Sequence, residues 1–487
     1  MPEIHFEPYL VLAGLTHEAA LVTWGGFYFR VRAKPDGERW KVVDDGDLKR
    51  LHPPRYECVG ARSTPYGHTV VQVFDTAGAP VVSAESSTCN HAWITGLTPD
   101  TEYRYRVTVN GEEWAAGPRR DWVEDGSVAG DLAETISAVP KAPHRRRVGL
   151  YRDEESPRSY DNRFRTFPAP DRVAPLTFAV LGDFGVGIRP GKADACQLEV
   201  SRALERAALE NDVRFVVTTG DNIYAKRVLG VPITDYGDED DDWFFTFHQP
   251  YRYLLNRMPF YPSVGNHDSA DIEENDDREQ VIDNLYLRER FAREETKGRA
   301  SIGPGLFYRF RFGALAEFVA LDTSRATVLP GTPRLFLHPN HAAFLEASFP
   351  AVSGGSEGVL WRLPFGHHPP YCAGPRHRNT ESMLEHLVPR FQRSGVRAFF
   401  AGHEHNYQHS LADGIHYFLT GAGGKVRTGV PRSTAEARTV SWAAAGHFLL
   451  VKLDAERMEV TPIGADGLPL GVTVIQEGGD VPVVVRL

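Results

Sequence analysis

The first third of the chain carries the short apolar and alternating runs that are typical of β-strands. Thr69–Phe74 is one such run between turn residues. Further along, a Pro-Asp turn leads into a strand whose Tyr103, Tyr105 and Val107 share one face. The pattern predicts an all-β sandwich domain over residues 1–170.

Beyond Leu176 the pattern changes, because apolar runs now alternate with segments of helical spacing. This alternation indicates an α/β domain, which we place over residues 171–487. The expected strands are Leu176–Leu181, Arg214–Thr218, Phe260–Val264, Leu315–Leu321, Val359–Leu363 and Val396–Ala401. The expected helices are Ala193–Leu209 and Glu381–Arg393. The tail 446–487 is β-rich again and is expected to complete a second sheet.

Two polar segments are expected to be irregular. Residues 111–158 are too many and too polar for one ordinary loop, so we interpret them as an insertion into the N-terminal domain. The acidic run Asp238–Asp242 lacks the glycine and ligand spacing of a calcium loop, which favours a solvated loop over a cation site.

Composition and charge narrow the class of protein. The 487 residues suffice for two or three domains, and 42% hydrophobic with 24% charged residues is ordinary for a globular protein. A formal charge of −10 without a basic block argues against a nucleic-acid partner. The sequence contains no run of about 18 apolar residues, so we expect no membrane-spanning segment. The first residues lack a secretory signal, so we expect a cytoplasmic protein unless a signal was removed.

The four cysteines do not form a disulfide framework. Cys58 and Cys89 both fall in the N-terminal region, where they either bridge or remain two reduced small side chains. The reduced form is favoured if the protein is cytosolic. Cys372 lies close to His367 in the sequence, but no cysteine motif surrounds it, so we do not interpret it as a nucleophile.

Five apolar runs each end in a glycine-led cluster of side chains that can bind metal ions. The clusters are Leu181–Gly185, Gly220–Tyr224, Gly265–Asp268, Gly366–Pro369 and Gly402–His405. A glycine at the carboxyl end of a strand allows a sharp turn and brings the next side chain to the rim of the sheet. Two cations held side by side are a standard device for hydrolysing phosphate esters. The series therefore predicts a hydrolytic metal centre.

The residue types also suggest which ions the centre would hold. Asp183 and Asp221 end two strands and can face one another, so that one carboxylate bridges two ions. Tyr224 lies three residues after Asp221, and a phenolate suits a trivalent ion because only a strong Lewis acid ionises it near neutral pH. Asn266 offers an amide oxygen to a divalent ion.

The order of these motifs resembles the purple acid phosphatases among the calcineurin-like metallophosphoesterases. The tyrosine three residues after the bridging aspartate, here Tyr224, separates that subfamily from the others. The resemblance covers about residues 176–424 and implies a pair of packed mixed β-sheets flanked by helices. The segment around Tyr103 resembles fibronectin type III domains, where the first tyrosine sits at a corner between sheets. Larger members of the phosphatase family also carry such an N-terminal domain.

The resemblance implies a ligand set and a reaction. The residues that would hold Fe(III) are Asp183, Asp221, Tyr224 and His405. Those that would hold a divalent partner, Fe, Zn or Mn, are Asp221, Asn266, His367 and His403. The implied reaction is that of an acid phosphatase, in which a metal-bound hydroxide hydrolyses a small phosphate monoester. His267 would hydrogen-bond the phosphoryl group, and His377 would protonate the leaving alcohol.

Other residues near the motifs receive simpler interpretations. Asp268 would orient a histidine or its loop, and Asp322 would support the structure at another strand end. Arg376 and Arg378 flank His377 and could attract phosphate. The histidines expected to pack or face solvent rather than bind metal are His368, His386, His409 and His416.

Two alternatives to a phosphomonoesterase stay open. The same fold could act on phosphodiesters or nucleotides, or the β-sandwich could bind a partner while the second domain is vestigial. The complete ligand set argues against the vestigial domain. The physiological ester, the divalent ion, the pH optimum and the oligomeric state are left open.

Overall fold

The computed structural model describes most of the chain. The described residues are 3–34, 37–42, 65–124, 148–151, 157–188, 195–228, 231–236, 243–268, 276–303, 305–324, 339–351 and 358–487. Cys58, the acidic run Asp238–Asp242 and much of the expected insertion lie outside these residues. The choice between a disulfide and two thiols, and the role of the acidic run, therefore stay open.

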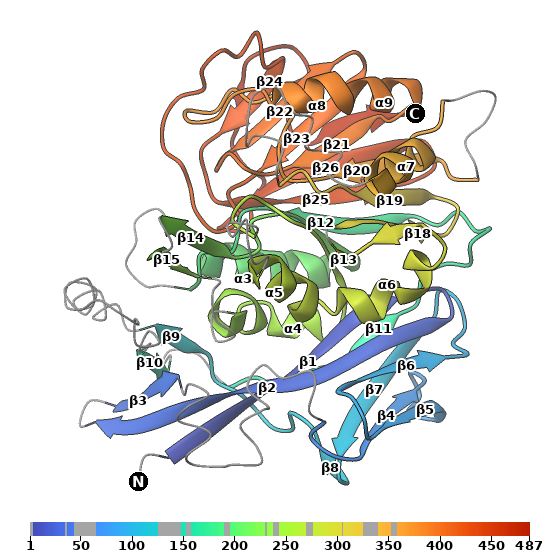
Figure 1. Ribbon diagram of the computed structural model, residues 1–487, viewed down its shortest axis with the longest axis vertical. Coiled ribbons are helices and arrows are strands. Elements are labelled where there is room, and N and C mark those ends of the chain that lie inside the picture. The colour runs from blue at the N-terminus through green and yellow to red at the C-terminus, as the bar shows by residue number, and fades with distance from the viewer. Residues whose placement is uncertain are drawn as a thin grey trace.

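The N-terminal region consists of two antiparallel sheets, at the bottom of Figure 1. The first has the order β1 (Glu3–Leu15), β2 (Ala19–Lys34), β3 (Gly37–Val42), β10 (Val148–Tyr151), β9 (Trp122–Glu124), with β6 (His91–Thr95) on β2. The second has the order β11 (Arg163–Arg165), β7 (Glu102–Val109), β4 (Thr69–Phe74), β5 (Pro80–Ser86), with β8 (Glu112–Glu113) on β7. The alternation along β7 buries Tyr103, Tyr105 and Val107, as predicted.

Tyr103 makes the contact expected of a corner tyrosine. Its hydroxyl accepts a hydrogen bond from the backbone N–H of Thr98, five residues upstream, at 2.9 Å. Among the residues that the structure describes, this region contains strands and no helix, as predicted. Its assignment to the fibronectin type III class, and the boundary at residue 170, stay predictions.

Two further sheets form the upper part of the molecule (Figure 1). The first has the order β16 (Phe260–Ser263), β13 (Val213–Thr219), β12 (Leu176–Leu181), β25 (His447–Leu453), β26 (Arg457–Gly464), β28 (Val483–Arg486). The second has the order β17 (Ala300–Ser301), β18 (Phe307–Phe312), β19 (Ala316–Ala320), β20 (Trp361–Phe365), β21 (Ala398–Ala401), β23 (Ile415–Thr420), β22 (Tyr407–Ala412), β24 (Thr439–Ala443), β27 (Thr473–Val474). A hairpin of β14 (Tyr224–Val228) and β15 (Val231–Tyr236) stands apart.

Parallel pairing within each sheet decides where the site forms. β16, β13 and β12 run parallel, as do β19, β20, β21 and β23. The carboxyl ends of parallel strands meet at one edge of a sheet, so the loops that follow them are neighbours. All six strands expected in this domain are present, with ends that differ by at most two residues.

Aromatic side chains pack the two sheets against each other. The ring of Phe318 on β19 meets Phe178 of β12 and Phe215 of β13 edge-to-face, each at 5.1 Å between centroids. Phe215 also meets Phe310 of β18 at 5.3 Å. Edge-to-face contacts favour fixed ring orientations, so they hold the two sheets in one relative position. The expected pair of packed mixed sheets is confirmed.

The helices are short and flank the sheets. They are α3 (Gln197–Glu210), a π-helical turn (Phe244–His248), α4 (Arg252–Leu255), α5 (Asp276–Asn284), α6 (Leu287–Glu295), α7 (Pro339–Ser348), α8 (Glu381–His386) and α9 (Val388–Arg393). None of the helices that the structure describes is long and apolar enough to cross a bilayer.

The single helix expected over Glu381–Arg393 is wrong, because the segment forms two helices that meet at Leu387. Pro389 explains the break. It has no N–H to continue the hydrogen bonding of α8, and it lies at the start of α9, where that N–H is not needed.

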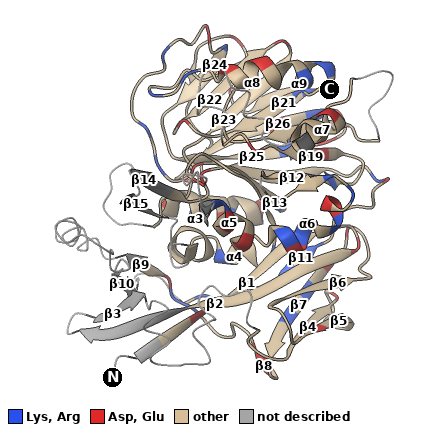
Figure 2. Ribbon diagram, in the orientation of Figure 1, with Lys and Arg blue, Asp and Glu red and all other residues tan. Residues whose placement is uncertain are grey.

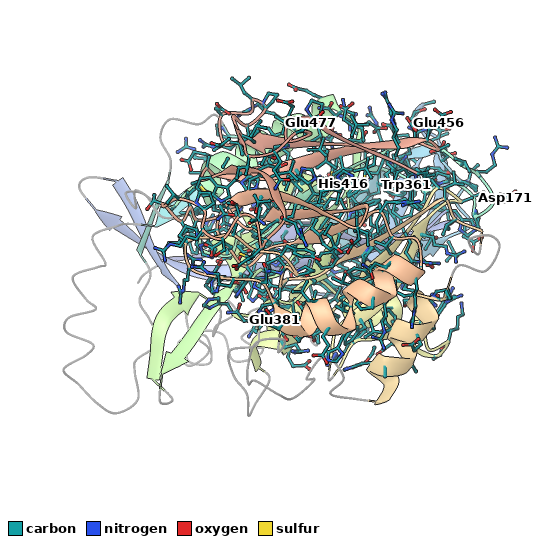
Figure 3. The ribbon with its side chains drawn as sticks, turned by 90° about the horizontal axis from the view of Figure 1, so that it is seen from above. Asp171, Trp361, Glu381, His416, Glu456 and Glu477 are labelled. Carbon is teal, nitrogen blue, oxygen red and sulfur yellow. The ribbon has the colours of Figure 1, made fainter. Side chains whose placement is uncertain are left out.

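The C-terminal tail also differs from expectation. β25 pairs antiparallel with β12, and β26 and β28 follow it, so three strands of the tail extend the sheet that contains β12. Only β27 joins the other sheet, through β24. Trp361 of β20, labelled in Figure 3, connects the larger sheet to the turn after β25, because its indole N–H donates to the carbonyl of Asp454 at 2.8 Å.

The N-terminal sheets dock on the helices beneath the sheet that contains β12. Tyr105 donates its hydroxyl to the Asn256 carbonyl at 2.7 Å, and Trp93 donates to the Glu289 carbonyl of α6 at 3.4 Å. Arg290 of α6 in turn donates to the Phe260 carbonyl of β16 at 2.7 Å. Figure 2 shows the mixed acidic and basic residues of α6 at this junction. Continuous contacts thus lead from the N-terminal sheets to the strands that carry the site.

Candidate metal centre

Five of the seven predicted metal ligands lie two or three residues after the end of a strand. Asp183 and Asp221 come two residues after the ends of β12 and β13, and Asn266 comes three residues after β16. In the facing sheet, His367 and His403 each come two residues after β20 and β21. Because these strands are parallel within each sheet, the five side chains are delivered to one place.

The turns that deliver these side chains are tight. Asp183, Asp221 and His403 adopt left-handed backbone conformations, with φ of 52°, 49° and 76°. Such conformations are costly for residues other than glycine and are concentrated at functional sites. A side chain at Gly265 would place its Cβ 2.1 Å from Asp221 Oδ1, so glycine is required there.

One group of donor atoms surrounds the hydroxyl of Tyr224. The Tyr224 oxygen lies 3.0 Å from His405 Nε2 and 3.4 Å from Asp183 Oδ1, and the last two atoms are 3.6 Å apart. The three side chains are buried. A carboxylate, a phenol and an imidazole at these separations form one face of a metal site.

A second group of donor atoms surrounds Nε2 of His367. It lies 3.0 Å from Asn266 Oδ1, 3.1 Å from His403 Nδ1 and 3.4 Å from Asp221 Oδ1. The other ring nitrogen of His367 lies 2.9 Å from the Thr219 carbonyl. A carbonyl oxygen only accepts hydrogen bonds, so Nδ1 of the neutral ring carries the proton and the lone pair of Nε2 faces the donor group.

Asp221 connects the two groups. One donor atom from each of Asp183, Asp221 and His367 lies within 4.8 Å of the others. The structure therefore brings together all seven predicted ligands: Asp183, Asp221, Tyr224, Asn266, His367, His403 and His405. That these atoms bind metal stays a prediction.

Electrostatics shows that the donor set fits cations. Burial, followed by the charge of Asp221, raises the pKa of Asp183 well above its ordinary value. Burial, followed by the two carboxylates, does the same to the pKa of Tyr224. Burial lowers the pKa of His403 and His405 well below the ordinary range, which keeps their lone pairs free. Two buried carboxylates repel each other, and neutral imidazoles do not compensate their negative charge. Bound cations would supply the missing positive charge.

Comparison with known proteins agrees with this geometry. Residues 176–407 match the family described as calcineurin-like phosphoesterase. The chain carries a calcineurin-like phosphoesterase domain. The resemblance drawn from the five motifs is thereby confirmed for the region that contains them.

Curated relatives are acid phosphatases, some of them of the purple type. Purple acid phosphatase 4 of Arabidopsis thaliana is 25% identical over 272 residues, which cover 53% of this chain and 70% of the relative. Tartrate-resistant acid phosphatase type 5 of Homo sapiens is 23% identical over 311 residues, which cover 61% of this chain and 89% of the relative. The chain is thus a distant homologue of this group.

Two solved structures share the fold along nearly the whole chain. A purple acid phosphatase from yellow lupin (Lupinus luteus) seeds has a TM-score of 0.57 at 12% identity, covering 97% of this chain and 74% of that one. PhoD has a TM-score of 0.57 at 11% identity, covering 96% of this chain and 88% of that one. At these identities the likeness concerns architecture alone, including the N-terminal sheets.

Within the phosphoesterase domain, Asp268 holds two motif loops together. Its carboxylate accepts hydrogen bonds from the backbone N–H of Gly265 at 2.8 Å and of Ile223 at 3.0 Å. It also accepts from the amide of Asn222 at 2.9 Å, and that amide donates in turn to the Ser263 carbonyl. Asp268 therefore orients the loops that carry Asp221 and Asn266.

The two predicted catalytic histidines lie at the open side of the site. The ring of His267 lies 4.5 Å from that of Tyr224, and its backbone N–H donates to Asp221 Oδ1 at 3.0 Å. The ring of His377 lies 3.9 Å from that of His403. Both are only partly buried, unlike Asp183 and Asp221. A substrate would reach the donor atoms from this side.

The sequence analysis assigned no role to Glu404, although this residue lies between His403 and His405 in the last motif. Its fully buried carboxylate accepts from the backbone N–H groups of His377, at 2.7 Å, and of Arg376, at 3.2 Å. Its other oxygen accepts from Arg427 at 2.6 Å. Glu404 therefore fastens the loop that carries His377 beside His403. A carboxylate between two histidine ligands was the signal for such a role.

The sequence analysis also assigned no role to Thr323, whose contacts with the loop after β20 become visible only in the folded chain. It follows β19, and its hydroxyl oxygen accepts from the backbone N–H groups of His367 at 3.1 Å and His368 at 2.9 Å. The neighbouring Asp322 pairs with the buried Arg278, and it accepts from the N–H of Leu306 at 3.0 Å. Together they hold the loop after β20 in place.

Other candidates take no part in the donor groups. The guanidinium of Arg378 turns back to the carbonyl of Gly374 at 2.6 Å. Cys372 is buried, and burial raises the pKa of its thiol to about 12, so it is no nucleophile at neutral pH. His409 and His416 stack on each other 5.1 Å apart on β22 and β23.

We predict that Asp221→Asn removes at least one metal equivalent per chain, because its carboxylate lies near both Asp183 of the first donor group and His367 of the second and carries charge that would offset the cations. Elemental analysis of the purified protein measures the loss. Asp212→Asn is a matched control, since Asp212 has a nearly identical φ of 50° but an exposed side chain. Equal metal contents in Asp221→Asn and the wild type would refute the shared role.

Proposed function

We propose that this chain is a dinuclear metallophosphatase of the purple acid type that hydrolyses small phosphate monoesters. Fe(III) would occupy one position, and a divalent ion, Fe, Zn or Mn, the other. The observation that carries the proposal is the meeting of two donor groups at Asp221, one of which contains the phenol of Tyr224. The phosphoesterase domain and its purple acid phosphatase relatives support the same class of reaction.

The two donor groups differ in the ion that they favour. The first, Asp183, Tyr224 and His405, suits a trivalent ion because a strong Lewis acid is needed to ionise a phenol whose pKa is raised by burial. The second, Asn266, His367 and His403, offers neutral donors and suits a divalent ion. When bound, the ions supply Lewis acidity that stabilises charge on the phosphoryl oxygens and favours ionisation of a water molecule.

His267 would position the phosphoryl group. Its backbone N–H is fixed by Asp221 and its ring by Tyr224, so the imidazole stands beside the first donor group with little freedom. From the open side it can donate a hydrogen bond to a phosphoryl oxygen. A donor placed in advance loses little entropy when the substrate arrives, which favours the oriented ester.

His377 would protonate the leaving alcohol. Glu404 fixes the backbone N–H of His377, and the imidazole lies against the ring of His403. A proton donor held near the divalent ion can reach the ester oxygen that leaves. Arg427, held by the same Glu404, adds positive charge at the rim, which attracts an anionic ester to a chain of net negative charge.

An interaction protein with a vestigial site fits less well. All seven predicted ligands are present, and the structure brings their donor atoms together. A site without selection for chemistry would keep neither the strained turns nor the buried carboxylates, because both cost stability.

The decisive assay compares two esters on one sample whose metals have been counted. We predict faster phosphate release from 4-nitrophenyl phosphate than cleavage of bis(4-nitrophenyl) phosphate, because a monoester presents more charge to two cations. A diester cleaved faster would replace the proposal by a phosphodiesterase. Absence of cleavage of either ester by metal-replete protein would refute an enzymatic function of this kind.

Fe(III) bound by Tyr224 would give the oxidised protein a visible colour, through phenolate-to-iron charge transfer. We predict that Tyr224→Phe removes this absorption band while circular dichroism shows an unchanged fold. Tyr105→Phe, which alters a buried tyrosine of the N-terminal domain, should keep the band. An iron-replete, oxidised wild type without colour would contradict the purple assignment, even if the phosphatase activity remained.

The role of His377 predicts a dependence on the leaving group. His377→Asn should lower the rate on an alkyl phosphate by about 100-fold, but much less on 4-nitrophenyl phosphate, whose phenolate leaves without a proton. His386→Asn on α8 is the control and should leave both rates unchanged. An equal loss on both esters in His377→Asn would remove the acid role and leave only a positioning role.

A further inference from the structure

His368 stands out among the histidines that the sequence analysis set apart from the metals. It follows His367 directly and is fully buried. Its Nε2 atom makes no hydrogen bond with any residue that the structure describes. A buried polar atom without a partner costs on the order of 1–3 kcal/mol, so its retention calls for an explanation.

The position of His368 suggests what this atom faces. Its ring centre lies 4.3 Å from that of His403 and 4.9 Å from that of His367. One nitrogen from each of the three imidazoles lies within 4.8 Å of the other two. Two of these residues are the histidines of the second donor group. His368 is therefore a third imidazole at the divalent position.

The hydrogen bonds of the ring indicate which nitrogen is free. Nδ1 lies 3.2 Å from the hydroxyl oxygen of Thr323, so this nitrogen has a hydrogen-bond partner. Nε2 has none among the described residues and is the nitrogen left to face an ion. A neutral imidazole that is protonated at Nδ1 offers the lone pair of Nε2 to a metal ion. In His367, too, Nδ1 has a partner, the Thr219 carbonyl at 2.9 Å.

We infer that His368 is a further ligand of the divalent ion and directs this position towards Zn(II). The inference rests on the dinuclear centre proposed above. Imidazole suits Zn(II), whereas carboxylate, carbonyl and water suit Mn(II). Either ion can be bound by two imidazoles, an amide and a carboxylate. A third imidazole raises the number of nitrogen ligands, which favours Zn(II) over Mn(II). His368 would thus decide between ions that the other four ligands accept.

The test measures metal selectivity of the full chain. Protein with iron already loaded is titrated separately with Zn(II) and with Mn(II) against a chelating dye. We expect His368→Asn to weaken Zn(II) binding by about 10-fold or more, and Mn(II) binding much less. Loss of a nitrogen ligand costs more with the ion that favours nitrogen. A ratio of the two affinities that is unchanged within about twofold in the variant would overturn the inference.

His447 provides a matched control. It is also fully buried, its Nδ1 lies 2.8 Å from the Ala445 carbonyl, and its Nε2 is likewise unpartnered among the described residues. It belongs to neither of the groups of described residues that could hold a metal. His447→Asn should lower stability without changing the Zn(II)-to-Mn(II) ratio. An equal change of the ratio in both variants would assign the effect to general destabilisation.

A spectroscopic count keeps the inference testable if His368→Asn does not fold. X-ray absorption at the zinc edge of the wild type should show three imidazole ligands, and two would overturn the inference. The result is also separate from the proposed function. Three imidazoles in a protein that cleaves no phosphate ester would leave this inference standing and refute the phosphatase. Two imidazoles in an active phosphatase would do the reverse.

Discussion

The repulsion between two buried carboxylates is the constraint around which the rest of the molecule is organised. Asp183 and Asp221 are buried, and a donor atom of each lies within 4.8 Å of the other. Burial and the negative charge of Asp221 raise the pKa of Asp183. The ionised form of this carboxylate is therefore unfavourable unless positive charge is present beside it. Cations would supply that charge. The strained turns and close glycine contacts are tolerable because the surrounding framework enforces them.

That framework depends on two sheets held at a fixed spacing. Each sheet supplies part of the donor set: the first carries both carboxylates and Asn266, and the second carries the histidines. Neither sheet alone could form a site, so the contacts of Phe178, Phe215 and Phe318 between them are a condition for the chemistry. A small change in sheet spacing would separate donor atoms that now lie about 3 Å apart.

A second set of contacts adapts this shared framework to one particular site. Thr323 fixes the two consecutive histidines after β20, and Glu404 fixes the loop that carries His377. Both act through backbone N–H groups, so they determine loop position whatever the side chains of the loop are. Differences between related phosphoesterases in metal or leaving group can thus arise in these loops while the strands stay unchanged.

The sequence alone predicted the fold class and six strands of the second domain, which the structure confirms, because strand periodicity is a local signal. It also predicted seven metal ligands, whose side chains the structure brings together and whose metal binding stays a prediction. It did not reveal the break of the helix before Pro389, although proline carried that signal. Only the tertiary structure placed the C-terminal strands beside β12 and revealed the contacts of Glu404, Thr323 and His368. These depend on contacts between segments far apart in the chain, where pairing and burial are settled by packing and leave no periodic trace in the sequence.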